Sequence, residues 1–81
     1  MKHYLKTWPK YFVDVKEGRK KFEIREDDRG FQMGDILILQ EYDPKIKKYT
    51  GEEVSMKVIY ITDFAQKEKF VVLGIENERE Q

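Results

Sequence analysis

Residues 21–26 alternate strictly between polar and apolar side chains, and this pattern constrains the fold more than any other feature. Phe22 and Ile24 are expected on one face of a strand, with Lys21, Glu23 and Arg25 on the other, which is typical of a half-buried strand. Further strands are predicted at residues 2–6, 36–39, 54–61 and 70–75. Short strands separated by turns favour a small closed or half-closed barrel, because closure removes exposed strand edges.

One helix is predicted near the start, over residues 9–17. Pro9 is favoured at the first helical position, and Thr7 or Trp8 could cap it. Gly18 follows the last turn, where a left-handed residue is needed. The predicted fold class is therefore mainly β with one principal helix, as a mainly antiparallel barrel of five to six strands. An OB-fold would fit the strand count, but the early helix is less usual for it.

A chain of 81 residues predicts one domain, with a thin core. We place the domain at residues 1–76 and a C-terminal tail at residues 77–81, with fraying expected from residue 76. The apolar positions of the predicted helix and strands give the expected core: Phe12, Val15, Phe22, Ile24, Ile36, Ile38, Val58, Val71 and Leu73.

Several kinds of site are excluded by composition. The chain has no cysteine, and its one histidine, His3, cannot build a metal site by itself and is expected to be structural. We therefore expect no metal and no cofactor. No membrane partner is expected either, since no apolar run approaches the roughly 20 residues that span a bilayer. The first residues lack the apolar core of a signal peptide, which predicts a cytoplasmic protein. The oligomeric state stays open.

The charge is unevenly distributed along a chain whose net charge is zero. Residues 1–25 contain eight Lys or Arg and three Asp or Glu, a balance of +5, so the remainder carries −5. A zero net charge argues against a general polyanion binder. A basic half can nevertheless form a local patch, although ordinary solvated surface is the alternative.

The densest polar segment is residues 18–25. Lys20, Lys21 and Arg25 could contact phosphates, and Arg25 could instead contact a base edge or a carboxylate. Glu23 lies between Lys21 and Arg25 on one face of the predicted strand. An ion-pair ladder without any ligand is the alternative interpretation of this pattern.

Three residues outside this segment are further candidates for the same site. Trp8 could stack on a base, or pack the helix start against the core. Lys6 ends the first predicted strand and could reach the site, or remain solvated. Arg29 could close the rim of the site, or pair with Asp28.

Gly18, Lys20, Glu23 and Arg25 match the Gly-x-Lys-x-x-Glu-x-Arg motif of ASCH domains. Strings around the motif, from about residue 3 to residue 75, resemble an uncharacterised bacterial and phage family related to ASCH. These strings include Trp8-Pro9-x-Tyr11-Phe12, Asp28-Arg29-x-Phe31-Gln32-x-Gly34-Asp35 and Glu41-Tyr42-Asp43-Pro44. The resemblance implies a PUA-like barrel whose motif lines an RNA-binding cleft between the barrel and the early helix.

Some ASCH proteins are amidohydrolases that act on acylated cytidine, with a Thr where this chain has Glu23. That departure puts hydrolase activity in doubt.

The motif also sets a geometric condition. Lys20 and Glu23 are three residues apart, so in one regular strand they would point to opposite faces. They can share a cleft only if Lys20 lies in the turn after Gly18.

Three classes of function remain. We favour a module that binds RNA, a nucleotide or a nucleoside through Lys6, Trp8, Lys20, Lys21, Glu23, Arg25 and Arg29. The second class is a small amidohydrolase acting on a modified nucleoside, with Lys20 and Glu23 as its catalytic residues. The third is an adaptor protein without a ligand, which an exposed apolar patch would favour.

Overall fold

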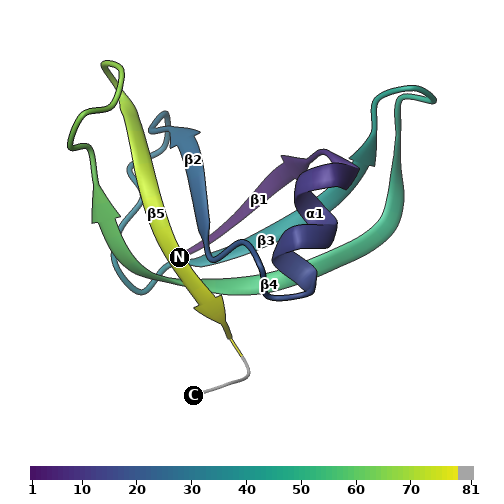
Figure 1. Cartoon of the computed structure of the whole chain (residues 1–81), viewed down its shortest axis with the longest axis horizontal. Helices are drawn as coiled ribbons and strands as arrows, with labels where there is room; N and C mark the ends of the chain where they lie inside the picture. Colours follow the sequence, from purple (N-terminus) through teal and green to yellow (C-terminus); the bar gives the residue numbers. More distant parts are fainter. Residues whose placement is uncertain (79–81) are drawn as a thin grey trace.

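Five strands in the described part of the chain form a single curled sheet, and one short helix packs against it (Figure 1). The structure is a computed structural model that describes residues 1–78. The elements are, in chain order, β1 (Lys2–Thr7), α1 (Pro9–Lys16), β2 (Phe22–Glu26), β3 (Ile36–Asp43), β4 (Lys48–Thr62) and β5 (Phe70–Asn77). The expectation of a mainly β, barrel-like fold with one helix is confirmed.

The sheet has the order β1-β3-β4-β5-β2, which places β1 and β2 at its two edges. β1 runs parallel to β3, and a parallel pair needs the long connection that α1 and β2 provide between them. The other three pairs are antiparallel. Because the sheet curls into a half-barrel, the side chain of Arg25 on β2 reaches the main chain of β1 across the open side. We call the gap between these two edge strands the seam.

The helix begins and ends close to where the sequence predicts. Pro9 is its first residue, and Trp8 precedes it in an extended conformation without a side-chain cap. Gly18 has a φ of 83°, in the left-handed region that favours glycine, so the chain turns back toward β2 at this point. Phe12 and Val15 are buried, whereas Trp8 is 43% exposed at the end of the helix that faces the seam.

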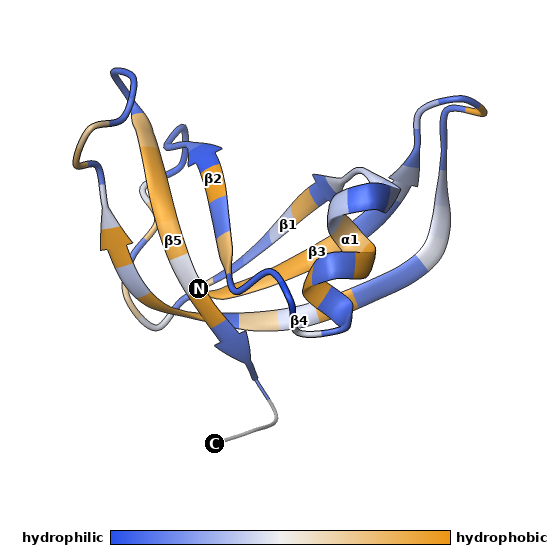
Figure 2. Cartoon of the chain, viewed as in Figure 1, coloured by the Kyte–Doolittle hydropathy of each residue, from blue (hydrophilic) through white to orange (hydrophobic). Residues whose placement is uncertain are grey.

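The core fills the inside of the half-barrel. Figure 2 shows apolar residues concentrated along β3 and β5, the strands on either side of the central strand β4. Leu37, Leu39 and Leu73 have no exposed surface. Six predicted core residues are buried, namely Phe12, Val15, Ile38, Val58, Val71 and Leu73. A seventh, Ile36, is half-buried at the start of β3.

The predicted faces of β2 were wrong. Phe22 and Ile24 are 42% and 52% exposed, and Glu23 is only 3% exposed. Glu23 is paired with Leu73 in the neighbouring strand, and opposite residues of an antiparallel pair share a face, so Glu23 faces the inside of the sheet. A strand at the seam can turn a polar face inward because cations are available there for the buried carboxylate.

The C-terminal boundary also differs from the prediction. β5 continues to Asn77, and its last two residues pair with Lys57 and Met56 of β4, so fraying does not begin at residue 76. Residues 79–81, the rest of the predicted tail, lie outside the described residues.

Candidate functional site

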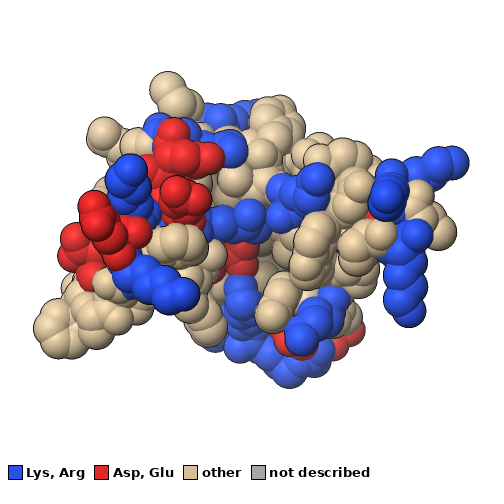
Figure 3. Space-filling view, turned by 90° about the horizontal axis from the view of Figure 1, so that it is seen from above, with Lys and Arg blue, Asp and Glu red and all other residues tan. Residues whose placement is uncertain are grey.

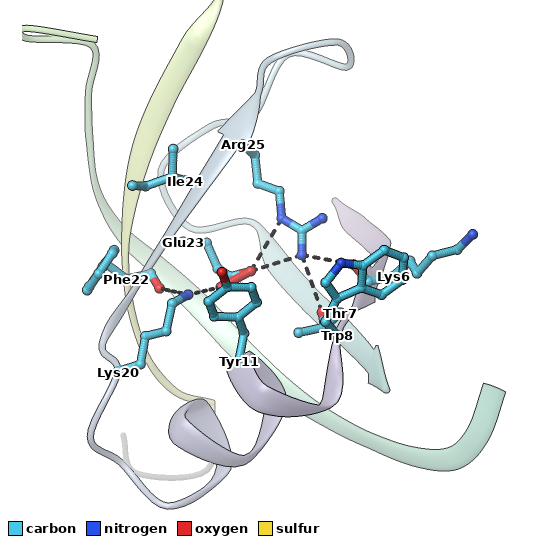
Figure 4. Close-up of a pocket in the computed structure, with 9 residues that line it drawn as sticks. All are labelled: Lys6, Thr7, Trp8, Tyr11, Lys20, Phe22, Glu23, Ile24 and Arg25. Atoms are coloured by element: carbon cyan, nitrogen blue, oxygen red, sulfur yellow. Dashed lines mark hydrogen bonds and ion pairs between the residues drawn. The ribbon is translucent and has the colours of Figure 1, made fainter. Parts of the chain in front are cut away.

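A cavity of about 720 Å³ opens at the seam, beside the start of α1 (Figure 4). Its lining comes from four parts of the chain that the curled sheet brings together. These lining residues are Lys6 and Thr7 of β1, Trp8 and Tyr11 at the start of α1, Lys20 of the following turn, and Phe22, Glu23, Ile24 and Arg25 of β2.

The turn after α1 places Lys20 beside Glu23. The main-chain N–H groups of Arg19 and Lys20 both donate to the carbonyl oxygen of Asp14, at 2.9 and 3.0 Å. This folds the chain back after Gly18, and Lys20 precedes the first residue of β2. The geometric condition set by the sequence motif is therefore met, since Lys20 reaches the cavity from a turn and Glu23 from a strand.

Glu23 is held between two cations. Its Oε1 accepts hydrogen bonds from Arg25, from Nη2 at 2.9 Å and from Nε at 3.3 Å. Its Oε2 forms an ion pair with the Nζ of Lys20. A buried carboxylate is costly unless it is paired and hydrogen-bonded, and here both oxygens have partners. One anion between two cations leaves this group with a charge of +1.

Arg25 also connects the two edges of the sheet. Its Nη2 donates to the carbonyl oxygen of Lys6 at 3.2 Å and lies 3.3 Å from the hydroxyl of Thr7. The Nζ of Lys20 similarly donates to the carbonyl oxygen of Phe22 at 2.7 Å, on the seam side of β2. Side chains therefore satisfy main-chain oxygens at the seam, where neither edge has a neighbouring strand.

Some donors in the cavity have no partner among the described residues. Nη1 of Arg25 makes no hydrogen bond within residues 1–78. The ammonium of Lys20 donates to two acceptors, Phe22 and Glu23, which leaves one of its three protons for a ligand. The Nζ of Lys6 lies 4.2 Å from the centre of the Tyr42 ring, as a cation–π contact rather than an ion pair. Arg25 and Lys20 can therefore still donate to an anionic ligand in the cavity, whereas the Lys6 side chain points away from Glu23 and Arg25 (Figure 4).

Aromatic rings flank the polar floor of the cavity. Trp8 and Tyr11, three residues apart on the same side of α1, are each 43% exposed. Figure 4 shows both rings beside Glu23 and Arg25. Phe22 and Ile24 contribute at the β2 rim, although their side chains point away from Glu23 (Figure 4). The site thus combines hydrogen-bond donors with flat apolar surfaces.

Charge on this side of the molecule is mixed. Figure 3, seen from above the open side, shows Lys and Arg side chains interspersed with Asp and Glu, and a carboxylate between cations near the middle of the face. The cavity is therefore a local cationic feature and not part of a uniformly basic surface.

The structure brings together five of the seven predicted binding residues: Lys6, Trp8, Lys20, Glu23 and Arg25. Lys21 lies outside the cavity lining with an exposed side chain, and its carbonyl oxygen accepts a hydrogen bond from Ile75 at 3.0 Å. Arg29 pairs with Asp28 at 3.2 Å and donates to the carbonyl oxygen of Tyr4 at 3.4 Å. Neither is among the residues that line the cavity, and Arg29 follows the far end of β2.

Sequence reasoning missed four lining residues: Phe22 and Ile24, which were assigned to the core, and Thr7 and Tyr11. Tyr11 carried a usable signal, since it follows Trp8 by three residues in a predicted helix, and this spacing places both on one face. Thr7 carried none, because its role depends on Arg25, which is 18 residues away in the chain.

A second buried polar group lies outside the cavity, at the start of the parallel strand pair. Nε2 of His3 is 2.8 Å from Oδ2 of Asp35, and the same oxygen accepts the main-chain N–H of Gln32 at 3.0 Å. Burial alone would raise the pKa of Asp35, but the hydrogen bonds from His3, from Gln32 and from the amino group of Met1 together outweigh it and lower the pKa. This group joins β1 to the start of β3, so His3 is structural, as predicted.

No three His, Cys, Asp or Glu side chains within residues 1–78 come together as a metal site. α1 has only eight residues, and the described part of the chain contains no helix with the length and apolarity that crossing a membrane requires.

Comparison with known proteins identifies relatives but no activity. Residues 2–75 match the family described as "Domain of unknown function (DUF3850)". The chain is also 38% identical over 63 residues to a protein of Escherichia phage P2 described as "Uncharacterized 12.9 kDa protein in GpA 3'region". This alignment covers 78% of the chain and 56% of the phage protein, so the chain spans about half the length of that relative. Since the family match covers nearly all of the sequence, the chain belongs to the DUF3850 family.

Proposed function

We propose that the cavity at the seam binds RNA or a nucleotide. The observation that carries this proposal is the buried position of Glu23, which is 3% exposed and held between Lys20 and Arg25. The rings of Trp8 and Tyr11 flank the same cavity. A buried carboxylate bridging two cations keeps both of them at fixed positions. Side chains held in this way bind a ligand with little loss of side-chain entropy.

Each part of the site suits one part of a nucleotide. Nη1 of Arg25 and the remaining proton of Lys20 can donate to phosphate oxygens, and charge-assisted hydrogen bonds of this kind are strong. The exposed faces of Trp8 and Tyr11 can stack on a base, which is worth roughly 1–3 kcal/mol per base. The cavity volume of about 720 Å³ is in the range of small-molecule sites.

The sequence resemblance supports the same proposal. Gly18, Lys20, Glu23 and Arg25 match the ASCH motif, and ASCH domains are proposed to bind RNA at the residues of that motif. We therefore propose that the fold is PUA-like and that this cavity corresponds to the ASCH cleft. An RNA or nucleotide ligand also fits a cytoplasmic protein, which we propose on the same basis.

One observation favours a second candidate function, a small amidohydrolase acting on a modified nucleoside. Lys20 and Glu23 are in direct contact inside the cavity, so a proton could pass between their side chains. This pair would supply the nucleophile or the acid and base of such a reaction. The binding function remains our first proposal, because ASCH amidohydrolases have a Thr at the position of Glu23.

The binding proposal is tested by the affinity for RNA of two neighbouring lysine variants. Lys20→Gln removes a cation from the cavity, and Lys21→Gln removes one outside it. Fluorescence anisotropy with a labelled single-stranded RNA should show weaker binding for Lys20→Gln and little change for Lys21→Gln. Binding should also weaken as salt rises, because phosphate contacts release counterions. Equal losses in the two variants would contradict a site at the seam.

Glu23→Gln separates binding from hydrolysis. In a binding module the loss of the carboxylate removes a negative charge that competes with phosphate for Lys20 and Arg25. This gain offsets the loss of orientation, so RNA affinity should stay equal or rise. In a hydrolase it removes a proton-transfer group, and turnover of acylated nucleosides should fall by roughly 10²–10⁴-fold. Turnover by the wild type that disappears in Glu23→Gln would replace the binding proposal. If the wild type shows neither turnover nor RNA binding, the adaptor class becomes the leading interpretation.

A further inference from the structure

A hairpin projects from the sheet beside the cavity. It consists of the end of β3, a turn, and the start of β4, and Figure 1 shows it extending away from the rest of the sheet, past α1. We call residues 42–49 the arm. The arm contains three lysines and one aspartate, a net charge of +2. Its turn is exposed, including Ile46, which is 62% exposed.

Aromatic rings connect the cavity to the arm without interruption. The ring of Trp8, at the cavity, lies 5.6 Å from that of Tyr42, and Tyr42 lies 5.0 Å from Tyr49 across the hairpin. Trp8 and Tyr49 are 43% and 54% exposed, so the outer surfaces of this row are open to solvent. Lys6, which lines the cavity, places its ammonium over Tyr42 at the junction.

The arm lysines continue this row toward the turn. Lys45, Lys47 and Lys48 are all exposed, and no ion pair engages any of them within residues 1–78. Figure 3 shows Lys and Arg side chains at the end of the molecule where the hairpin lies in Figure 1. By contrast, Lys20 and Arg25 in the cavity are partly neutralised by Glu23. Carboxylates therefore neutralise less of the positive charge in the arm than in the cavity.

We propose that the arm extends the cavity site, so that the ligand is a single strand of several nucleotides rather than one free nucleotide. One nucleotide occupies the cavity, and a neighbouring base lies against Tyr49, which Tyr42 supports from across the hairpin, while the phosphates contact Lys47 and Lys48. Aromatic platforms alternating with cations are the usual means of holding a single strand, with about 4–16 nucleotides per site. This inference rests on the proposed nucleotide-binding function.

The test compares one nucleotide with a strand. Adenosine 5′-monophosphate is titrated by calorimetry, and a labelled RNA octamer of mixed sequence by fluorescence anisotropy. The arm variant is Lys47→Asn with Lys48→Gln. Asn is chosen at 47 because Lys47 has a φ of 56°, in the left-handed region that Asn tolerates. The matched control is Lys67→Gln with Lys69→Asn, since Lys69 has a φ of 70° and this loop lies at the other side of the molecule (Figure 1).

The arm variant should bind the octamer roughly tenfold more weakly, and its salt dependence should fall by a slope of about 1.4, the share of two single-strand phosphate contacts. Its affinity for the mononucleotide should be unchanged, and the control should bind both ligands as the wild type does. Tyr49→Leu keeps an apolar residue on the hairpin but removes a stacking surface, and should weaken octamer binding at least about fivefold. The affinity for a DNA octamer of the same sequence is compared with that for the RNA octamer. Equal affinities would indicate a site for single strands in general, and weaker DNA binding would indicate a preference for RNA.

An octamer that binds no more tightly than the mononucleotide would overturn the inference, and so would equal losses in the arm and control variants. These outcomes would leave the proposed function intact, provided that Lys20→Gln still weakens mononucleotide binding. Failure of the mononucleotide and both octamers to bind the wild type would instead remove the proposed function and this inference together.

Discussion

Arg25 of β2 donates a hydrogen bond from Nη2 to the main-chain oxygen of Lys6 of β1, across 3.2 Å. These residues lie on the two edge strands of the half-barrel, so a side chain bridges a gap that no strand pairing closes. The same guanidinium binds the buried carboxylate of Glu23. The stability of the sheet edges and the chemistry of the cavity therefore depend on one residue.

Replacing Arg25 should show this dual role. Arg25→Gln removes the bridge to β1 and leaves Glu23 with Lys20 as its only cation, so the free energy of unfolding should fall by about 1–3 kcal/mol. Urea denaturation measures this loss. Arg19→Gln is the control, because Arg19 forms ion pairs with Asp14 and Glu17 on an exposed surface and its loss should have little effect. Similar small changes in both variants would show that the bridge does not stabilise the seam.

The reversed faces of β2 give a second prediction about stability. Phe22 is 42% exposed, so Phe22→Ala should lower the free energy of unfolding by about 1 kcal/mol or less. Leu73, with no exposed surface, lies in the adjacent strand, and Leu73→Ala should cost about 2–5 kcal/mol. Thermal melting of the two variants checks the order. A larger loss for Phe22→Ala would mean that Phe22 faces the core after all.

The lowered pKa of Asp35 predicts that the stability of the protein depends on pH. Burial disfavours its charge, but hydrogen bonds from His3, Gln32 and the amino group of Met1 together outweigh burial and lower the pKa of Asp35 below that of the unfolded chain, about 4. A lowered pKa contributes stability above the unfolded value, and this contribution is lost as pH falls through the folded value. The advantage of the wild type over Asp35→Asn should therefore shrink as pH falls from about 5 to below about 4. Urea denaturation between about pH 5 and pH 3 measures it, and an advantage that stays level or grows over this acidic range would contradict the assignment.

The helix and the site lysine could be predicted from local rules. Pro9 and Gly18 mark the two ends of α1 because each fits a backbone conformation that other residues adopt less easily. The turn after Gly18 was required by the spacing of Lys20 and Glu23, and the structure contains it. Such signals lie within a few residues of the feature that they determine.

The faces of β2 could not be predicted in the same way. Alternation identifies a strand but leaves open which face is buried. Hydrophobicity favoured burial of the face with Phe22 and Ile24 over the face with Glu23. The two cations that bind Glu23 are local, but its inward face is set by pairing with Leu73 of β5, which is distant in sequence. Arg25 likewise needs distant contacts, to Lys6 and Thr7 of β1. The aromatic row from Trp8 to Tyr49 has the same origin, because it needs the curled sheet to bring α1 beside the hairpin.

The central claim, that RNA or a nucleotide binds in the cavity at the seam, is tested most directly by nuclear magnetic resonance of the ¹⁵N-labelled protein. Trp8 is the single tryptophan of the chain, so its indole N–H gives one unambiguous signal at the cavity. Adding adenosine 5′-monophosphate or the RNA octamer should shift this signal and the Nε–H of Arg25 saturably, with weaker binding at higher salt. Both signals remaining unchanged up to millimolar ligand, or saturable shifts confined to residues away from the seam, would contradict the claim.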